Sequence, residues 1–411
     1  MIKITDKADC CGCSACAQAC PRHCIFMCMD EEGFRYPKVN LSICINCGLC
    51  EKVCPVINVE PEKINEGQSA FLLQLKDDQI RKESTSGGAF TAISNWVLDH
   101  GGFVYGAQLK YRGNSNNSEK DGWYVCHCKV KDKESLSFFR NSKYVQSDLG
   151  DSFKEIKELL KDDQWVLFSG TPCQIEGLLQ YLKKSKKEKL VLVDVVCYGI
   201  PSPGLFRDYM EWKQKDIGGT FSRVLFREKR LCYNYTSFSI YNKDEKLNYH
   251  SGVEREPFMR SFFSDINVRP SCYQCRFKKR YRVSDFTIWD CYDVKSFSKN
   301  FDDNGTNRIL IHSELGRKIF EDIKPLIKFE QFLDIEKFIA DEVALVKSVP
   351  KEPKRDDFFR DYAKMDIAAL MQKWYPTTLK VRMNSFLRML AFKLGVYSSA
   401  KRFVKKILRR N

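Results

Sequence analysis

Eleven of the 19 cysteines in this 411-residue chain lie between Cys10 and Cys54, and eight of these form two copies of one motif. Each copy has the spacing C-x-x-C-x-x-C-x-x-x-C-P, which binds 4Fe-4S clusters in two-cluster bacterial ferredoxins. Three cysteines of a copy bind one cluster, and the fourth ligates the other cluster. We therefore predict two ligand sets: Cys10, Cys13, Cys16 and Cys54 for cluster 1, and Cys44, Cys47, Cys50 and Cys20 for cluster 2.

A pair of zinc knuckles is the alternative for this region. Structural zinc sites usually combine two separated cysteine pairs or include histidines, so the motif favours iron and sulfide. Cys11, Cys24 and Cys28 fall outside the motif, and we expect them to be buried apolar residues rather than ligands.

Four further cysteines are expected to meet at one edge of a sheet. Cys173 follows one predicted strand and Cys197 ends the next strand of the same βαβ unit. Both therefore lie at the carboxyl edge of parallel strands, where open α/β sheets bind ligands. With Cys272 and Cys275 folded over this edge, the four thiolates would suit a third 4Fe-4S cluster. A zinc-binding or structural C-x-x-C pair and two unconnected buried cysteines are the alternatives.

Two polar segments could contact an anionic cofactor. Residues 84–88 open a predicted helix, so their backbone N–H groups could cradle a phosphate, although Ser86 could equally be only the helix cap. Residues 143–147 place Lys143 before a second helix and could hold a diphosphate or ring, or form a solvated turn. Cys126 and Cys128 share a strand face with His127 opposite, a pattern that favours core packing over metal binding.

The composition indicates a folded protein of the cytoplasm. The chain is 43% hydrophobic and 29% charged, and it has no signal-like apolar segment at its N-terminus, so its many cysteines are expected to be reduced thiols. The formal net charge is +15, but residues 379–411 carry ten Lys and Arg and no acid, which leaves about +5 for the remainder.

This basic tail has apolar residues at helical spacing from Leu379 to Tyr397. Docking on the inner face of a membrane and packing against a partner or itself are both open. Nucleic-acid binding is not expected, because no nucleic-acid module accompanies the charge.

The remaining sequence predicts an α/β fold, with α+β character, built on a mixed sheet. Residues 71–75 form a strand that leads through a Gly-rich loop into a helix, and residues 165–196 form a βαβ unit with two parallel strands. We predict a bacterial-type two-cluster ferredoxin module at residues 1–58, one α/β domain in two parts at 68–150 and 151–350, and a helical basic tail at 351–411.

Five ordered segments resemble the coenzyme F420 hydrogenase/dehydrogenase beta-subunit family over roughly residues 68 to 330. They are residues 84–91, 143–147, 168–174, 194–203 and 271–275. The resemblance implies a flavin-binding domain that normally holds FAD, and it strengthens the case for the third cluster. It points most directly to Ser86, Gly87, Gly88 and Thr91. The candidate flavin contacts are Ser84, Thr85, Ser86, Gly87, Gly88, Thr91, Lys143, Tyr144 and Gln146.

The resemblance also implies a function. Electrons would pass between a protein or reduced-cofactor partner, the clusters and a flavin that acts on a small organic substrate. That substrate could be F420-like or a surface-polysaccharide or other biosynthetic intermediate, and the alternative is an electron-transfer subunit without its own substrate chemistry. Where relatives often have Gly-Asp, this chain has Trp289-Asp290, which predicts a reshaped pocket. No single acid or base can be assigned from the sequence.

Overall fold

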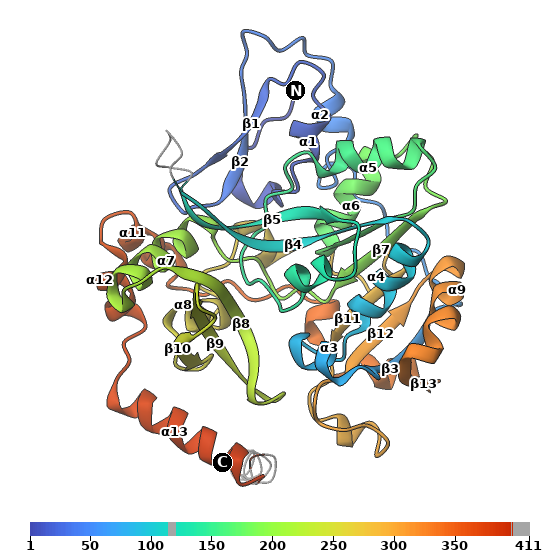
Figure 1. Ribbon diagram of the computed structural model, residues 1–411. Coiled ribbons are helices and arrows are strands. Elements are labelled where there is room, and N and C mark those ends of the chain that lie inside the picture. The colour runs from blue at the N-terminus through green and yellow to red at the C-terminus, as the bar shows by residue number, and fades with distance from the viewer. Residues whose placement is uncertain (114–120, 396, 398–411) are drawn as a thin grey trace.

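The computed structural model of the protein describes residues 1–113, 121–395 and 397, so the end of the predicted tail, residues 398–411, lies outside the described residues. The N-terminal module stands at the top of Figure 1, above a large sheet and a smaller one that lies beside the large sheet. In the module one antiparallel hairpin lies between two short helices in the chain. The order is α1 (Ala15–Gln18), β1 (Ile25–Met29), β2 (Arg35–Val39) and α2 (Leu49–Lys52).

The large sheet has eight strands in the order β13-β3-β12-β11-β7-β6-β4-β5. The four central strands β11, β7, β6 and β4 are parallel, and the flanking strands are antiparallel, so the predicted mixed sheet is confirmed. The strands are β3 (Ser69–Leu75), β4 (Phe103–Arg112), β5 (Gly122–Val130), β6 (Val166–Gly170), β7 (Leu190–Val195), β11 (Phe286–Asp290), β12 (Asn307–Ile311) and β13 (Ile327–Phe332).

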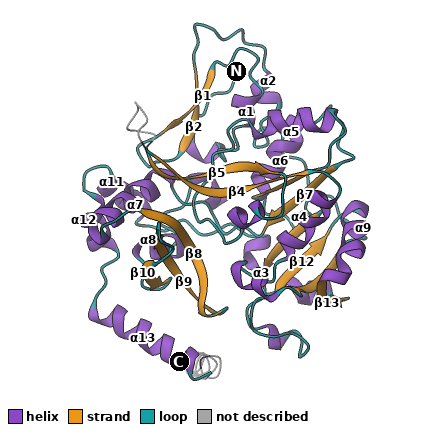
Figure 2. Cartoon of the chain, viewed as in Figure 1, coloured by secondary structure: helices purple, strands orange, loops and turns teal. Residues whose placement is uncertain are grey.

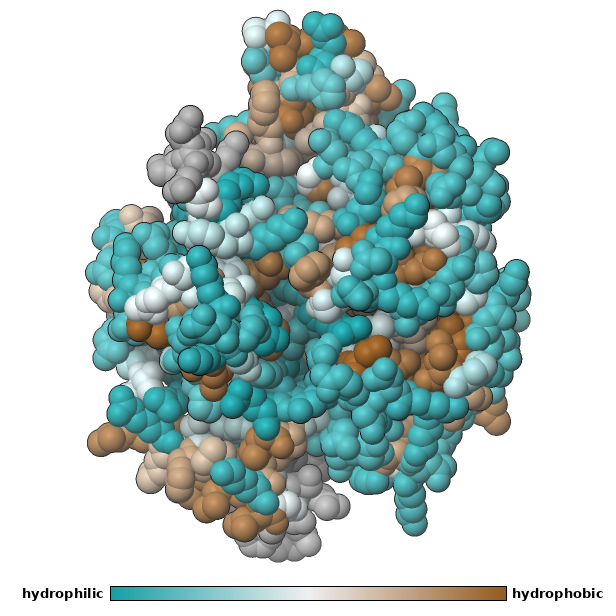
Figure 3. Space-filling view, viewed as in Figure 1, coloured by the Kyte–Doolittle hydropathy of each residue, from teal (hydrophilic) through white to brown (hydrophobic). Residues whose placement is uncertain are grey.

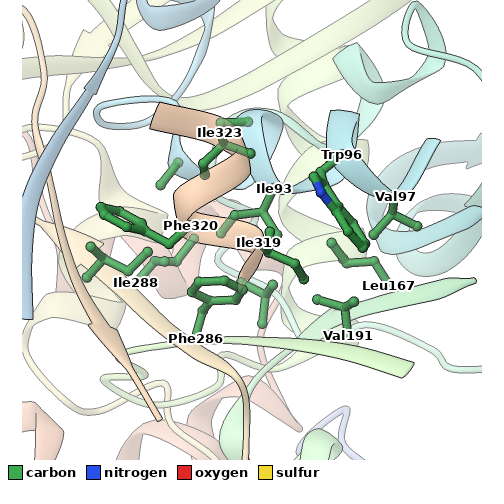
Figure 4. Close-up of a cluster of buried hydrophobic side chains, with 14 of the residues drawn as sticks. Ile93, Trp96, Val97, Leu167, Val191, Phe286, Ile288, Ile319, Phe320 and Ile323 are labelled. Atoms are coloured by element: carbon green, nitrogen blue, oxygen red, sulfur yellow. The ribbon is translucent and has the colours of Figure 1, made fainter. Parts of the chain in front are cut away.

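Helices cover both faces of this sheet, as Figure 2 shows. The helices of this domain are α3 (Asp78–Glu83), α4 (Ala89–Asp99), α5 (Ser152–Lys161), α6 (Pro172–Tyr181), α9 (Glu314–Ile323) and α10 (Ile335–Ile339). Alternate residues of the central strands point to opposite faces: Leu167 and Val191 pack under α4 and α9 (Figure 4), whereas Phe168 packs with α5 and α6. Both faces are therefore buried, which explains the nearly continuous apolar composition of these strands.

A second, three-stranded antiparallel sheet lies beside the first, with the order β10-β9-β8. Its core is aromatic, and Phe226 packs against Phe206, Phe238 and Phe258. The strands and their covering helices are α7 (Pro203–Ile217), β8 (Phe221–Cys232), β9 (Tyr235–Asn242), β10 (Leu247–Gly252), α8 (Pro257–Phe263), α11 (Arg355–Tyr362), α12 (Ile367–Trp374) and α13 (Leu379–Lys393). Between residues 355 and 393 the chain forms the helices α11, α12 and α13, in agreement with the helical character predicted for this region.

Candidate functional site

The four cysteines predicted for cluster 2 line one cavity in the N-terminal module. Cys20 comes from the first copy of the motif, and Cys44, Cys47 and Cys50 come from the second copy. Backbone N–H groups point at two of the sulfurs: Cys24 N donates to Cys20 Sγ at 3.4 Å, and Ile2 N donates to Cys50 Sγ at 3.2 Å. Four cysteine sulfurs around one cavity, two of them with N–H donors directed at them, form a donor set that fits a 4Fe-4S cluster.

The cysteines predicted for cluster 1 are also neighbours, and they again include a residue from the other copy of the motif. Burial, together with negative charge on Cys10 and Cys54, raises the pKa of the Cys16 thiol to about 12. Burial and charge on Cys10 also raise the pKa of Cys54. Closely spaced buried thiols disfavour free thiolates, whereas metal binding stabilises them, so the environment suits metal ligands.

The third set meets at the carboxyl edge of the large sheet. Cys173 lies in the first turn of α6, Cys197 follows β7, and the C-x-x-C pair lies in a turn at residues 270–275. Burial, together with negative charge on Cys173 and Cys275, raises the pKa of Cys197 to about 12. Burial and charge on the other three thiols raise the pKa of Cys272 well above its usual value. All four predicted residues are therefore mutual neighbours.

Cys11 joins the first and third sets. Its buried thiol is within hydrogen-bonding contact of Cys13 and of Cys173. Cys16 in turn packs in the same buried cluster as Cys20. The three sets therefore form one continuous row, in the order cluster 2, cluster 1 and the third set, and Cys11 occupies the junction between the last two.

Arg269 is a functional residue that the sequence did not reveal. It is 0% exposed, and its guanidinium donates to Cys10 O at 2.7 Å, to Gln146 Oε1 at 2.9 Å and to Arg35 O at 3.0 Å. It also lies over the ring of Tyr36 at 4.2 Å. Among the described residues it has no carboxylate partner. Burial alone would lower its pKa, but negative charge on neighbouring cysteines of the first and third sets raises it.

An unpaired buried cation is unfavourable unless an anion compensates it. Clusters ligated by four thiolates would supply that negative charge on both sides of Arg269. The position of this side chain is therefore independent support for anionic groups at the first and third cysteine sets.

The predicted loop at residues 84–88 lies between β3 and α4, and its partners are largely internal. Ser86 Oγ donates to Thr306 O at 2.5 Å and contacts Tyr233 Oη at 3.0 Å. Ser86 does not cap the helix, because the N-cap of α4 is Gly88, whose φ of +89° favours glycine. Thr91 is buried within α4. The hydroxyl of Thr85 lies 3.1 Å from that of Ser142, the residue that precedes the second predicted segment.

Two lysines at this junction have backbone carbonyls as partners. Lys143 Nζ donates to Arg140 O at 2.7 Å, and Lys229 Nζ donates to Ser86 O at 2.7 Å. In the described part of the chain neither forms an ion pair with a carboxylate. Burial lowers the pKa of each lysine to about 7. Lys229 was not recognised from the sequence because it belongs to no motif.

Arg227 lies between the predicted segment at residues 143–147 and a large cavity. Its guanidinium donates to Tyr144 Oη at 3.3 Å and to Asp290 Oδ2 at 2.5 Å. Arg227 and Tyr292 line a cavity of about 790 Å³ that extends to α13. Its other lining side chains are mostly aromatic and polar, and two are arginines, Arg260 and Arg388.

The side chains of Trp289 and Asp290 lie in different environments. Trp289 is buried and packs against the ring of Phe338, whereas Asp290 faces Arg227. The tryptophan therefore packs in a hydrophobic core and does not line the 790 Å³ cavity.

Cys126 and Cys128 lie close together, and the histidine between them in the sequence is buried. Cys126 Sγ and Cys128 Sγ are 3.4 Å apart and partly exposed, and His127 is buried beside Ser169 O. Burial lowers the pKa of His127 to about 4, so this histidine is neutral. In the described ranges no group of three His, Cys, Asp or Glu side chains has the arrangement expected of a single-ion site.

Replacing Gly87 by alanine is expected to lower stability by about 1–3 kcal/mol through overpacking. A Cβ there would lie 2.4 Å from Leu73 O and 2.5 Å from Asn307 N, both backbone atoms of paired strands. Urea unfolding measures the effect, with Gly67→Ala as the control, because Gly67 also has no positive φ and a Cβ there would make only ordinary contacts at 3.4–3.5 Å. An unchanged midpoint for Gly87→Ala would contradict this packing role.

Comparisons with known proteins agree with this geometry. Residues 9–58 match the 4Fe-4S dicluster domain, and residues 163–332 match the family described as the C terminus of the coenzyme F420 hydrogenase/dehydrogenase beta subunit. Ferredoxin-1 of Caulobacter vibrioides is 32% identical over 17% of this chain and 57% of its own length. Ketoisovalerate oxidoreductase subunit VorC of Methanothermobacter marburgensis is 31% identical over 16% of this chain and 90% of its own length.

One solved structure covers more of the chain. A chain of the F420-reducing [NiFe] hydrogenase complex from Methanosarcina barkeri aligns with 76% of this chain and 94% of its own length, at 13% identity and a TM-score of 0.42. The matched domains define an iron-sulfur protein of the electron-transfer oxidoreductase class. The chain therefore contains a domain similar to the C terminus of the coenzyme F420 hydrogenase/dehydrogenase beta subunit, and an N-terminal 4Fe-4S dicluster ferredoxin domain precedes it.

Proposed function

We propose that this chain is a flavin-dependent iron-sulfur oxidoreductase that transfers electrons between a redox partner and a small organic substrate. The continuous row of three cysteine sets is the observation that carries the proposal. It runs from the outer end of the N-terminal module to the carboxyl edge of the large sheet, where Cys11 contacts Cys173.

The cysteines of the three sets would hold three 4Fe-4S clusters, the third by Cys173, Cys197, Cys272 and Cys275. When bound, such clusters exchange single electrons, and a flavin couples them to two-electron chemistry on an organic molecule. The four cysteines of the third set are partly buried, and the positive charge of Arg269 would offset the negative charge of their thiolates.

Lys143 and Lys229 would bind the diphosphate of FAD, because each brings a partly buried ammonium group to the junction of the loops at residues 84–88 and 141–146. The hydroxyls of Thr85 and Ser142 lie between these loops and would add donors. The 790 Å³ cavity beyond Arg227 would take the substrate, and its three arginines favour an organic anion.

A second function has a specific observation in its favour. The hydroxyl of Ser86 and the N–H of Ala89 are already bonded to Thr306 and Asn307, so this helix start offers an anion few free donors. An electron-transfer subunit that binds clusters but no flavin, with substrate chemistry on a partner, accords with that arrangement.

Anaerobically purified protein is expected to contain about twelve irons and one flavin.

FAD affinity should fall as the pH rises from 6 to 8.5, because Lys143 and Lys229 lose their protons near pH 7. The Lys143→Gln/Lys229→Gln variant should bind FAD at least about tenfold more weakly at pH 6 and lose most of the pH dependence. Flavin fluorescence titration measures both effects.

Lys318→Gln is the matched control, because Lys318 is an exposed lysine on α9. Full iron content without flavin in the wild-type protein would favour the electron-transfer subunit. Equal FAD affinity in wild type and double variant would remove the lysines from the flavin site.

A further inference from the structure

Helix α13 has one side covered with exposed apolar residues. At 3.6 residues per turn these side chains fall within an arc of about 100°. They are Leu379, Met383, Phe386, Leu387, Leu390 and Leu394. Leu379 is 82% exposed and Leu394 is 65% exposed, and Figure 3 shows hydrophobic residues gathered at this lower end of the molecule. We call these six residues the apolar face of α13.

The opposite side of α13 is attached to the second sheet. Ser385 Oγ donates to Glu254 Oε1 at 2.7 Å, and the ring of Phe392 lies 5.4 Å from that of Tyr235. Arg388 lies over the same tyrosine ring at 5.9 Å. These contacts fix the rotation of the helix, so the apolar face points away from the protein.

Basic residues border the apolar face on both sides. By the same helical geometry Lys380 lies along one border, and Arg382 and Lys393 lie along the other. Residues 379–411 contain ten Lys and Arg and no acid. This combination of an apolar stripe and cationic borders complements a surface with anionic headgroups above an apolar layer.

We propose that α13 docks the protein onto an anionic lipid bilayer, with its apolar face at the boundary between headgroups and acyl chains. Two copies of this helix would face each other with like charge, which disfavours self-association. Nucleic acid would leave the apolar face exposed. No helix in the described part of the chain is both long and apolar enough to cross the membrane, so docking is at the surface.

The test is sedimentation of the full chain with vesicles. The wild-type protein is expected to sediment with phosphatidylglycerol/phosphatidylcholine vesicles and much less with phosphatidylcholine alone. Phe386→Gln/Leu387→Gln should weaken anionic-vesicle binding by about tenfold or more. The reason is that the variant loses the apolar surface that these two exposed side chains would bury in the bilayer. Both residues are exposed, so an unchanged thermal unfolding curve checks that the fold is intact.

Leu333→Gln is the matched control, since Leu333 is 89% exposed but follows β13 on the large sheet. This variant should bind vesicles as the wild type does. Vesicle binding unaffected by the double substitution would overturn the proposal. A solution dimer that the double substitution dissociates, without vesicle binding, would assign the apolar face to a second copy and would also overturn it.

Discussion

Cys54→Ser is expected to remove cluster 1 and leave cluster 2, although Cys54 belongs to the second copy of the motif. The thiol of Cys54 lies next to Cys10 and Cys16. Cys20, in contrast, lines the cavity with Cys44, Cys47 and Cys50. Iron should fall from about twelve to about eight atoms per chain, because serine is a poor ligand for these clusters. Anaerobic iron and sulfide analysis with electron paramagnetic resonance after dithionite reduction measures the loss.

The exchange of ligands between copies gives the experiment its controls. The spectrum of Cys54→Ser should match that of Cys16→Ser, and the spectrum of Cys20→Ser should match that of Cys47→Ser. If the spectrum of Cys54→Ser instead matched that of Cys47→Ser, and the spectrum of Cys20→Ser matched that of Cys16→Ser, each copy would bind its own cluster. Unchanged iron in all four variants would reject the iron-sulfur assignment of the module.

Replacing Arg269 by leucine is expected to destabilise the protein by about 3 kcal/mol, because three acceptors lose their donor. The acceptors are Cys10 O, Arg35 O and Gln146 Oε1. Loss of the positive charge should also shift the reduction potentials of the neighbouring clusters to more negative values, since reduction adds an electron to an anionic group. Thermal unfolding and potentiometric titration monitored by paramagnetic resonance measure the two effects.

Two further variants separate charge from packing. Arg269→Lys keeps the charge and should restore most of the potential but only part of the stability. Arg308→Gln removes another buried arginine, which pairs with Asp341, and should lower stability without moving the potentials. Potentials that are identical in wild type and Arg269→Leu would limit Arg269 to a structural role.

The sequence was sufficient for the features that depend on local spacing. The βαβ unit of β6, α6 and β7 and the α4 helix after β3 were predicted, because apolar runs and Gly-rich turns mark them directly. The cysteine sets were grouped from their motifs, and the structure brings the members of each set together. The ligand roles themselves stay predictions.

The features that sequence reasoning missed depend on contacts between distant segments. Arg269 lies 259 positions from Cys10, and Lys229 lies 143 positions from Ser86, so no motif contains either pair. The β8–β9 pairing contains register shifts that break the regular alternation of side chains. The antiparallel edge formed by β12, β3 and β13 also has no local signal, because strand order is set by packing.

The junction at Cys11 has a consequence for biogenesis. A ribosome completes the N-terminal module long before it synthesises Arg269 and the cysteines that follow it, and domains generally fold in that order. In the folded chain Cys11 and Cys13 are buried in the cluster that includes residues of α6, whereas Cys47 of the second set stays exposed. A cluster bound by the first set would therefore be enclosed when the later segments fold against the module, and a cluster bound by the second set would remain close to the surface.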